Sequence, residues 1–493
     1  MSNLPNNWED IGFGELNRFA SKTIDPANSP EEEFELYSVP SFPTGIPEIQ
    51  RGSAIGSTKQ MVEPGDVLVC KINPRINRVW QVGPKKSRQQ IASSEWIVLR
   101  APDIDARFPR YFFSSPEFRE LICQDVTGVG GSLTRAQPKR VATFRLPIPP
   151  LNEQQRIADK LDAVLAKVDA CREHLDRVPA ILKRFRQAVL AAATSGRLTE
   201  EWRRVGNSSA GAFEILEQIS SERTLRSLPS SRREVRDEGI EMPTSELPEK
   251  WAWCRIGNIA DVQLGGTPSR KEPEYWSGNI PWVSSGEVSN CRIVDTAEKI
   301  TRIGLENSNA KIYPKGTVLI AMIGEGKTRG QSAILDVAAT TNQNSAGLVF
   351  DVPLVEPEYI WFWALGEYEK NRDVGRGGNQ PALNGAKVRA LPLPLPPCEE
   401  QQEIVRRVEA LFAFADRLET RYAAARAQVE RLTPALLAKA FRGKLVEQDP
   451  NDEPASKLLE RIQAARAAAP ARTKTRWTRK TKICNESSIG EAP

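Results

Sequence analysis

Residues that could bind nucleic-acid phosphates and base edges gather in one short segment of the first third of the chain. The segment KINPRINRVW carries Lys71, Arg75 and Arg78 among asparagines and a tryptophan, and Arg135 follows further along. Cationic side chains neutralise phosphates, and arginine, lysine and asparagine hydrogen-bond bases in the major groove. A solvated hairpin has a similar composition, so this pattern alone leaves DNA contact and a plain surface loop equally open.

A second set of such residues lies between positions 264 and 344. The predicted DNA contacts there are Ser269, Arg270 and Lys271 in one segment, Lys327 and Arg329 in another, and Gln343 and Asn344 in a third. Asparagine and glutamine can bind adenine with two hydrogen bonds, and arginine and lysine bind guanine. The tryptophans nearby are expected to pack within the protein, because reading a duplex requires no unstacked bases.

Side chains for catalysis are scarce. The chain has one histidine, His174, which leaves almost nothing from which to build a Ser-His-Asp triad or a histidine-rich metal site. The seven cysteines are scattered without a CxxC pair, so we expect buried free thiols rather than disulfides or zinc ligands. We therefore predict no catalytic residue, no metal and no cofactor bound by this chain.

One segment imitates a phosphate-binding loop. AMIGEGKT at 321–328 has the GK[ST] ending of such loops, but Ala321 replaces the first glycine and no helix is expected after Thr328. A phosphate-binding loop needs that helix N-terminus to hold the phosphates. The same segment fits the end of a nuclease motif, without a convincing partner aspartate. Nucleotide binding is therefore the weakest of the interpretations.

Composition favours a protein of several domains with a polyanionic partner. The chain has 493 residues, a hydrophobic fraction of 40% and a formal net charge of +5. That length is sufficient for two to four domains, and the mild excess of positive charge favours nucleic acid. The sequence shows no apolar run of membrane-spanning length, and its first residues have no signal-peptide character, so we expect a cytoplasmic protein with no membrane contact.

Two repeated helices are expected to position the binding residues. The segments LPIPPLNEQQRI and LPLPLPPCEEQQEI start them, with Asn152 as the expected cap of the first. Ile157 and Ile404 lie 247 residues apart, and the same offset relates Glu153 to Glu400. The predicted coiled-coil seam consists of Ile157, Leu161, Val164, Val168, Leu175 and Leu182 in the first helix, and Ile404, Val408, Leu411, Leu418, Val429 and Leu432 in the second.

A single helix cannot bury such a stripe alone, so the two copies are expected to pair with each other, antiparallel and within one molecule. From Ile157 to Val189 the helix would rise about 48 Å, somewhat more than one turn of B-DNA. Pro179 and Pro434 are expected to kink the helices. An ordinary helical hairpin in a globular core is the alternative.

The predicted fold class is α+β, with two mixed α/β units in tandem, separated and followed by the long helices. The predicted segments are a first unit (1–145), a first helical segment (146–202), a polar linker (203–248), a second unit (249–392), a second helical segment (393–446) and a basic, mobile tail (447–493).

This layout resembles the specificity subunit of type I restriction-modification systems. The helix starts PPLNEQQRI and PPCEEQQEI are the most specific part of the resemblance. Further similar segments are VPSFPTGIPE (39–48), IGSTKQMVEPGDVLVCKINPRI (55–76), IASSEWIVL (91–99), LGGTPS (264–269), IPWVSSGEV (280–288), KGTVLIAMIGEGKTRGQSAIL (315–335) and TNQNSAGL (341–348). The linker and the tail are outside the resemblance.

The resemblance implies that each unit is a target-recognition domain that reads one half of a bipartite, asymmetric site on double-stranded DNA. It also implies that the helices fix the gap between the half-sites and dock two modification subunits, which carry an adenine methyltransferase. Restriction subunits would join that complex. S-adenosylmethionine, ATP and Mg would bind in those partner subunits. Two other interpretations stay open: a coiled-coil scaffold that joins two protein-binding units without DNA readout, and an NTPase that uses the 321–328 loop.

Overall fold

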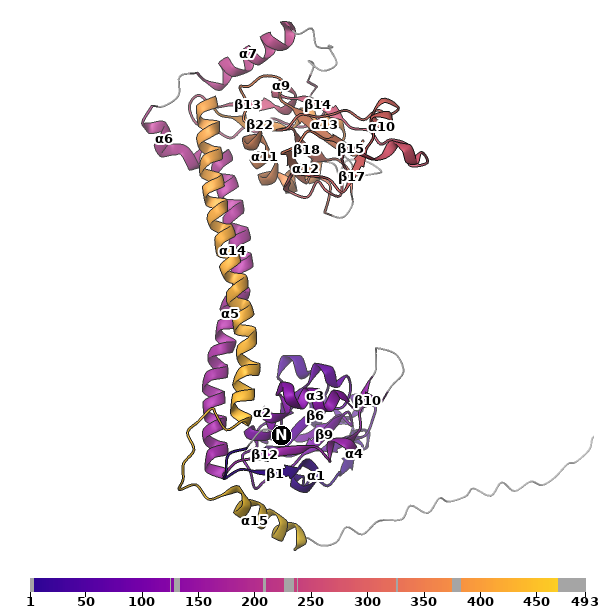
Figure 1. Cartoon of the computed structure of the whole chain (residues 1–493), viewed down its shortest axis with the longest axis vertical. Helices are drawn as coiled ribbons and strands as arrows, with labels where there is room; N and C mark the ends of the chain where they lie inside the picture. Colours follow the sequence, from indigo (N-terminus) through magenta and orange to yellow (C-terminus); the bar gives the residue numbers. More distant parts are fainter. Residues whose placement is uncertain are drawn as a thin grey trace, which may run out of the picture. The chain divides into compact units, whose positions relative to one another are not determined.

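The computed structural model of the chain describes residues 4–124, 126–127, 134–206, 210–225, 235–236, 238–324, 327–374 and 383–468. Contacts between residues divide the chain into unit 1, residues 1–174 with 425–493, and unit 2, residues 175–424. Both divisions fall inside the long helices, so each unit combines a sheet-containing region with part of each helix (Figure 1). We call these regions sheet region 1 (residues 8–148) and sheet region 2 (residues 251–395).

Sheet region 1 contains two main sheets. The five-stranded sheet has the order β2 (Thr23–Ile24), β5 (Lys59–Met61), β8 (Gln89–Ala92), β3 (Glu33–Tyr37) and β4 (Glu48–Arg51). The three-stranded sheet has the order β7 (Val79–Gln81), β6 (Val67–Cys70) and β9 (Trp96–Leu99). All residues of β6 and β9 are buried, which explains their uninterrupted apolar sequences. Both strands were predicted from sequence, at 66–70 and 95–99.

Two strand pairs and several short helices complete sheet region 1. β1 (Glu9–Gly12) pairs antiparallel with β12 (Arg145–Ile148), and β10 (Val126–Thr127) pairs with β11 (Arg135–Ala136). The α-helices are α1 (Phe13–Leu16), α2 (Arg107–Phe113), α3 (Pro116–Gln124) and α4 (Pro138–Val141), and the 3-10 helices are η1 (Pro26–Asn28), η2 (Phe42–Thr44), η3 (Gly52–Ala54) and η4 (Pro74–Ile76). Because β12 pairs with β1, this region extends to residue 148, three residues beyond the predicted boundary.

Sheet region 2 contains a five-stranded sheet in the order β14 (Asp261–Leu264), β21 (Ser345–Val349), β18 (Val318–Ala321), β19 (Ser332–Leu335) and β16 (Cys291–Ile293). A three-stranded sheet has the order β17 (Glu298–Ile300), β15 (Trp276–Val283) and β20 (Thr340–Thr341), and β13 (Ala252–Arg255) pairs with β22 (Pro392–Leu395). Its helices are α9 (Ile256–Ile259), η6 (Pro273–Tyr275), α10 (Arg302–Glu306), α11 (Pro357–Gly366), α12 (Tyr368–Val374) and α13 (Gly385–Ala390).

The loop that imitates a phosphate-binding loop has the wrong continuation for one. Residues 327–330 form a turn, and the chain then enters β19 rather than a helix. The described part of this segment therefore lacks a helix N-terminus after Thr328, which is the feature that would bind phosphates. Glu325 and Gly326 lie outside the described residues.

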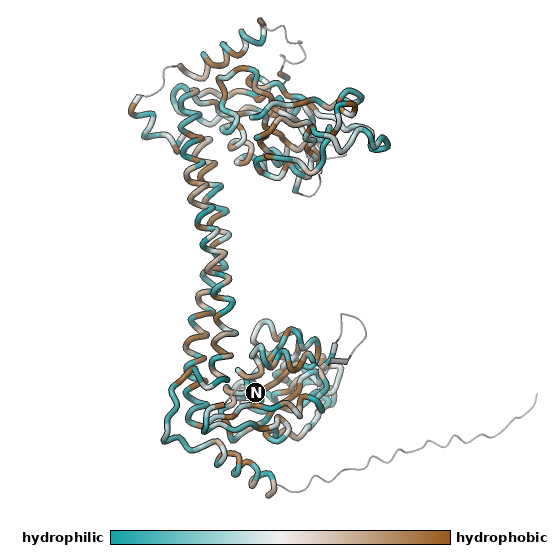
Figure 2. The backbone as a smooth tube through the Cα atoms, in the orientation of Figure 1, coloured by the Kyte–Doolittle hydropathy of each residue, from teal (hydrophilic) through white to brown (hydrophobic). Residues whose placement is uncertain are grey.

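The long helices are α5 (Leu151–Thr194) and α14 (Cys398–Phe441). In unit 1, Ile157 and Leu161 of α5 share a core with Leu437 of α14. In unit 2, Val189 of α5 shares a core with Ile404 of α14. The start of each helix therefore packs beside the end of the other, which makes the pairing antiparallel, and Figure 2 shows apolar residues recurring along both helices. No helix in the described ranges is long and apolar enough to span a membrane.

The buried stripe departs from a strict heptad near the helix ends. Most predicted seam residues are buried or half-buried, but Leu432 is 39% exposed, whereas Leu437 is only 2% exposed. In the last turns of α14 the residues that face inward are Val429, Thr433 and Leu437, which follow one another at intervals of four residues. This spacing replaces the alternation of four and three because an undistorted helix drifts from a seven-residue repeat. The prediction of Leu432 as a seam residue is therefore wrong.

Two further expectations concern the helices. Both helices continue through their prolines, Pro179 and Pro434, and the kinks expected there stay a prediction. The first helix begins at Leu151, so Asn152 lies in its first turn instead of capping it. The Asn152 side chain donates a hydrogen bond to Asp452 Oδ1 at 3.2 Å.

The predicted linker and tail both contain a helix that packs on a sheet region. After α6 (Glu200–Arg204), α7 (Ala212–Leu225) buries Ile215 and Ile219 in the core of unit 2. α15 (Ala455–Ala467) buries Leu458 and Ile462 in the core of unit 1. The prediction of a mobile tail from residue 447 is thus wrong as far as residue 468, and residues 469–493 lie outside the described part.

Helices α7 and α15 are equivalent copies related by 243 residues. The first backbone N–H of α7, at Ala212, donates to the carbonyl of Lys250 at 2.9 Å, and that of α15, at Ala455, donates to the carbonyl of Asn7 at 3.1 Å. Each accepting residue directly precedes a buried tryptophan. The internal repeat therefore extends through two segments that sequence reading treated as unrelated.

Candidate nucleic-acid interface

The four cationic residues predicted to bind DNA in sheet region 1 lie close together. Lys71, Arg75 and Arg78 occupy the connection between β6 and β7 that contains η4. The backbone N–H of Ala136 donates to the carbonyl of Lys71 at 2.8 Å, which brings Arg135 beside this connection. Residues far apart in sequence thus form one basic surface.

One carboxylate partly neutralises that surface. Glu95 accepts a hydrogen bond from Arg135 at 3.2 Å, and its carboxylate lies 3.8 Å from Lys71 Nζ. Lys71 Nζ also donates to the Ser94 carbonyl at 2.7 Å. Arg75 is exposed, and the half-buried Arg78 donates to a backbone carbonyl. Two of the four cations pair with this one carboxylate, so the surface keeps net positive charge, as phosphate binding requires.

The predicted residues of sheet region 2 lie on loops at one end of its five-stranded sheet. Because neighbouring strands there are antiparallel, the last residues of β14 and β18 lie beside the first residues of β21 and β19. The loops at this end carry Ser269, Arg270, Lys271, Lys327, Arg329, Gln343 and Asn344. Three separate sequence segments therefore meet at a single sheet end.

Two glycines allow the first of these loops to approach its neighbours closely, Gly265 the third loop and Gly266 the segment at Ala310. A Cβ atom at Gly265 would lie 2.0 Å from the carbonyl oxygen of Thr341, and one at Gly266 would lie 2.5 Å from the backbone nitrogen of Ala310. Thr267 Oγ1 then donates to Gln343 Oε1 at 2.6 Å. Any larger residue would push the loops apart, which explains the sequence LGGT.

Arg270 is held by contacts within the protein. Its guanidinium forms a two-point ion pair with Glu298, one hydrogen bond of which measures 2.8 Å, and this pairing lowers the pKa of Glu298. The same guanidinium lies 3.7 Å from the ring centre of Trp276, which packs edge-on against the buried Trp282. The tryptophans pack, as expected. Lys271, next in sequence, is exposed.

Arg329 is the one predicted contact that the structure does not support. Its side chain is buried, with only 4% of the residue exposed. The turn at 327–330 closes with a hydrogen bond from Gly330 N to the Ala321 carbonyl at 2.9 Å, which folds Arg329 inward. Lys327 and Gln343 are exposed and Asn344 is half-buried, so these three remain predictions.

Sequence reading missed the residues that attach each sheet region to its helix. Glu153 and Glu400 are each 1% exposed. The indole Nε1 of Trp8 donates to Glu153 at 3.0 Å, and that of Trp251 donates to Glu400 at 2.8 Å. The repeated EQQ was the available signal, but it was interpreted as a helix start and as the most specific part of the resemblance, without a tertiary partner.

The glutamine after each glutamate makes a second, equally buried attachment. Gln154 Nε2 donates to the Pro149 carbonyl at 2.9 Å, and its Oε1 accepts from the backbone of Asp105 at 3.2 Å. In unit 2, Gln401 bonds the carbonyl of Pro396 and the backbone N–H of Glu356, both at 2.9 Å. Matching bonds in both units show that these glutamines are positioning residues.

Each buried glutamate also binds the chain that leaves the other helix. Glu153 accepts a hydrogen bond from Gln448, and burial raises the pKa of its carboxyl. Glu400 accepts from Arg203 and, at 2.6 Å, from Thr199. Each glutamate therefore joins a sheet region, the start of one helix and the end of the other.

This fold and these surfaces define a class of binding protein. Such a protein has two units, in which repeated helices carry sheet regions with basic loop surfaces. Among the described residues, no group of His, Cys, Asp and Glu is arranged to hold a metal ion. The family model described as type I restriction modification DNA specificity domain matches residues 5–179 and 248–425. The chain belongs to this family.

Individual relatives agree with this assignment. The chain is 30% identical to the specificity subunit of the type I restriction enzyme EcoDI of Escherichia coli over 96% of this chain and 98% of the relative. It is 30% identical to the EcoKI specificity subunit of E. coli strain K12, over 85% and 84% of the two chains. Membership confirms the interpretation as a specificity subunit rather than a catalytic one.

Solved structures share the fold. The HsdS subunit from Thermoanaerobacter tengcongensis matches with a TM-score of 0.59 and 19% identity, over 90% of this chain and 98% of that one. A chain from a study of complex assembly and conformational transition in the type I restriction-modification system matches with a TM-score of 0.61 and 19% identity, over 90% and 100%. Both support the α+β fold with two sheet regions and long helices.

Proposed function

We propose that this chain directs a type I restriction-modification complex to a split DNA sequence, with each sheet region reading one half. The observation that carries the proposal is the repeat of one attachment, Trp8 to Glu153 and Trp251 to Glu400, on two sheet regions whose loops differ. Equal attachments imply equal roles, and unlike loops imply unlike half-sites. A reader of this kind recognises an asymmetric, interrupted sequence.

The readout surfaces in this proposal are the basic surface around Lys71 and Arg135 and the loop end around Lys271 and Gln343. Both combine cations, which neutralise phosphates, with amides, which hydrogen-bond base edges. The chain supplies recognition only. S-adenosylmethionine, ATP and Mg would serve the partner subunits.

The proposed partners are two modification subunits, carrying the adenine methyltransferase, and the restriction subunits that join them. Two copies of the modification subunit fit a chain whose helices repeat the same surface after 247 residues. A repeated surface offers two equivalent docking positions.

Mapping of modified adenines across the genome tests the proposal. Cells would express the chain with its modification subunit, in wild-type form and with residues 252–395 exchanged for those of another family member. This range keeps β13 and β22 together. We expect an interrupted motif in which one half changes with the exchange. A continuous motif, or one that the exchange leaves unchanged, contradicts the proposal and favours a scaffold without DNA readout.

A further inference from the structure

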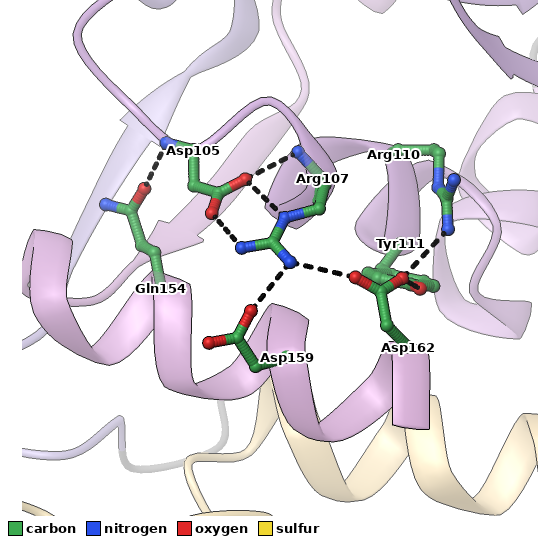
Figure 3. Close-up of polar contacts among 7 residues, drawn as sticks. All are labelled: Asp105, Arg107, Arg110, Tyr111, Gln154, Asp159 and Asp162. Carbon is green, nitrogen blue, oxygen red and sulfur yellow. Dashed lines mark hydrogen bonds and ion pairs between the residues drawn. The ribbon is translucent and has the colours of Figure 1, made fainter. Parts of the chain in front are cut away.

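Each sheet region touches its helix at a second place, beyond the buried attachment. In unit 1, Arg107 of α2 donates to Asp162 of α5 at 2.9 Å and to Asp159 at 2.7 Å (Figure 3). The Tyr111 hydroxyl donates to the same Asp162 carboxylate, and Arg110 lies 3.6 Å from it. Asp162 is thus the helix carboxylate on which three side chains of α2 converge.

Unit 2 makes a matching contact at the equivalent helix position. Glu409 lies 247 residues after Asp162 and accepts a hydrogen bond from Arg292 of β16 at 3.1 Å. Arg292 is itself oriented by Asp336 at 3.0 Å and lies 5.4 Å from the ring centre of Trp361. The helix position is shared, although the arginines come from unlike elements.

The two contacts of each unit are well separated along the helix. Asp162 follows Glu153 by nine residues, and Glu409 follows Glu400 by nine, which corresponds to about 13 Å along the helix axis. A body attached at one place can pivot, whereas a body attached at two separated places keeps its angle. The second contact lies farther from the helix start than the buried glutamate and glutamine attachments, so it resists rotation of the sheet region with a longer lever arm.

We infer that Asp162 and Glu409 are positioning residues that set the angle of each sheet region on its helix, and so restrict the number of base pairs tolerated between the half-sites. This inference rests on the proposed function. A surface about 15 Å from the pivot, the radius of a domain of this size, moves by one base-pair step of about 3.4 Å when the domain turns by about 13°. A small rotation would thus admit a wrong spacing.

The exposure of these ion pairs indicates the size of the effect. The side chains of Arg107 and Asp162 are 32% and 41% exposed, and those of Arg292 and Glu409 are 33% and 52% exposed. Ion pairs that are this accessible to water change the equilibrium between two orientations of a sheet region by up to about fivefold. Such a shift alters spacing tolerance, while the buried cores keep the fold.

The test measures binding of the assembled complex, this chain with its modification subunit, to duplexes that carry both half-sites at the natural spacing or one base pair shorter or longer. The test variants are Asp162→Asn and Glu409→Gln. The controls are Asp169→Asn and Asp416→Asn, which remove carboxylates one heptad further along each helix. Both control carboxylates pair with helix arginines, Arg172 and Arg186.

We expect each test variant to lower the affinity ratio of natural to altered spacing by up to about fivefold, with base preference unchanged. The control variants should keep the wild-type ratio, and the conservative variants Asp162→Glu and Glu409→Asp should recover part of it. An unchanged ratio in the test variants, or an equal fall in the controls, overturns the inference. Absence of any interrupted site in the wild type instead overturns the proposed function, so the two failures are distinguishable.

Discussion

Trp8 and Glu153 lie 145 positions apart in sequence, yet the indole Nε1 donates to the carboxylate at 3.0 Å inside the protein. Trp8 is 5% exposed and Glu153 is 1% exposed, so water cannot replace either partner. Gln448, from the far end of the chain, donates to the same carboxylate. Three distant segments thus converge on one buried side chain.

Glu153→Ala should therefore destabilise the protein more than an ordinary glutamate substitution. The change leaves the buried Trp8 indole without its acceptor and removes one hydrogen bond of the exposed Gln448, and a buried unpaired donor costs about 1–3 kcal/mol. Urea unfolding followed by tryptophan fluorescence measures the loss. The exposed Glu173→Ala serves as a control and should stay within about 0.5 kcal/mol of the wild type. Equal losses for the two variants contradict the convergence described here.

Truncation should separate the packed part of the tail from the rest. A chain that stops after residue 468 should keep the wild-type unfolding midpoint, because the helix α15 remains complete. A chain that stops after residue 446 loses Leu458 and Ile462 from the core of unit 1. Removal of each buried side chain costs about 2–5 kcal/mol, so unit 1 should unfold at much lower denaturant. Matching midpoints for the two truncations would show that α15 contributes nothing.

Arg270→Ala and Lys271→Ala should differ in their effect on the stability of the protein. Arg270 pairs with Glu298 and lies over Trp276, so its loss should lower stability by about 0.5–2 kcal/mol as well as affecting DNA binding. Lys271 is exposed, so its loss should leave stability unchanged, weaken binding to all sequences alike and reduce the salt slope by about one. Thermal unfolding together with DNA titration at several salt concentrations tests both. Intact binding in both variants would place the second reading surface elsewhere.

Leu437→Ala and Leu432→Ala should have unlike effects, although both leucines fall on the last turns of one helix. Leu437 is 2% exposed, and its truncation should cost about 2–5 kcal/mol. Leu432 is 39% exposed, and its truncation should cost less than about 0.5 kcal/mol. Denaturant midpoints decide the matter. A larger loss of stability for Leu432→Ala than for Leu437→Ala would instead support a strict heptad seam that includes Leu432.

Acid should weaken the contact between the tail and α5. The Arg156 guanidinium, which donates to Asp452 at 2.6 Å, holds the pKa of Asp452 below its ordinary value of 3.8. A carboxyl whose pKa is depressed in the folded state contributes stability above its unfolded value and loses it as the pH falls through the folded value. The stability difference between wild type and Asp452→Asn should thus be constant above about pH 5 and shrink below pH 3.8. A difference that stays constant to pH 3 contradicts the assignment.

Periodicity sufficed to predict the paired helices, because a stripe repeated after 247 residues requires a partner and the other copy supplies one. It could not locate the drift at Leu432, which depends on helix geometry accumulated over many turns. Composition identified the basic segment around Lys71, since the required residue types are adjacent in sequence. It could not show that Arg329 turns inward, because burial depends on how the turn closes.

The buried EQQ attachments were beyond sequence reasoning for a different reason. A glutamate and a glutamine at a helix start predict a solvated cap, and only the tertiary partners Trp8 and Trp251 reveal burial. The same holds for α15, whose alanine-rich and arginine-rich sequence resembles a mobile tail. Its apolar residues stabilise the helix only by packing against the core of unit 1.

The pairing of β1 with β12, and of β13 with β22, places the first and last strands of each sheet region side by side. Both chain crossings between a sheet region and the rest of the protein therefore occur at one small site, although they are more than a hundred residues apart in the gene. Two genetic exchanges at these crossings would replace a whole sheet region and leave the helices intact. New DNA targets could then arise by recombination in a single event, without slow remodelling of an existing reading surface.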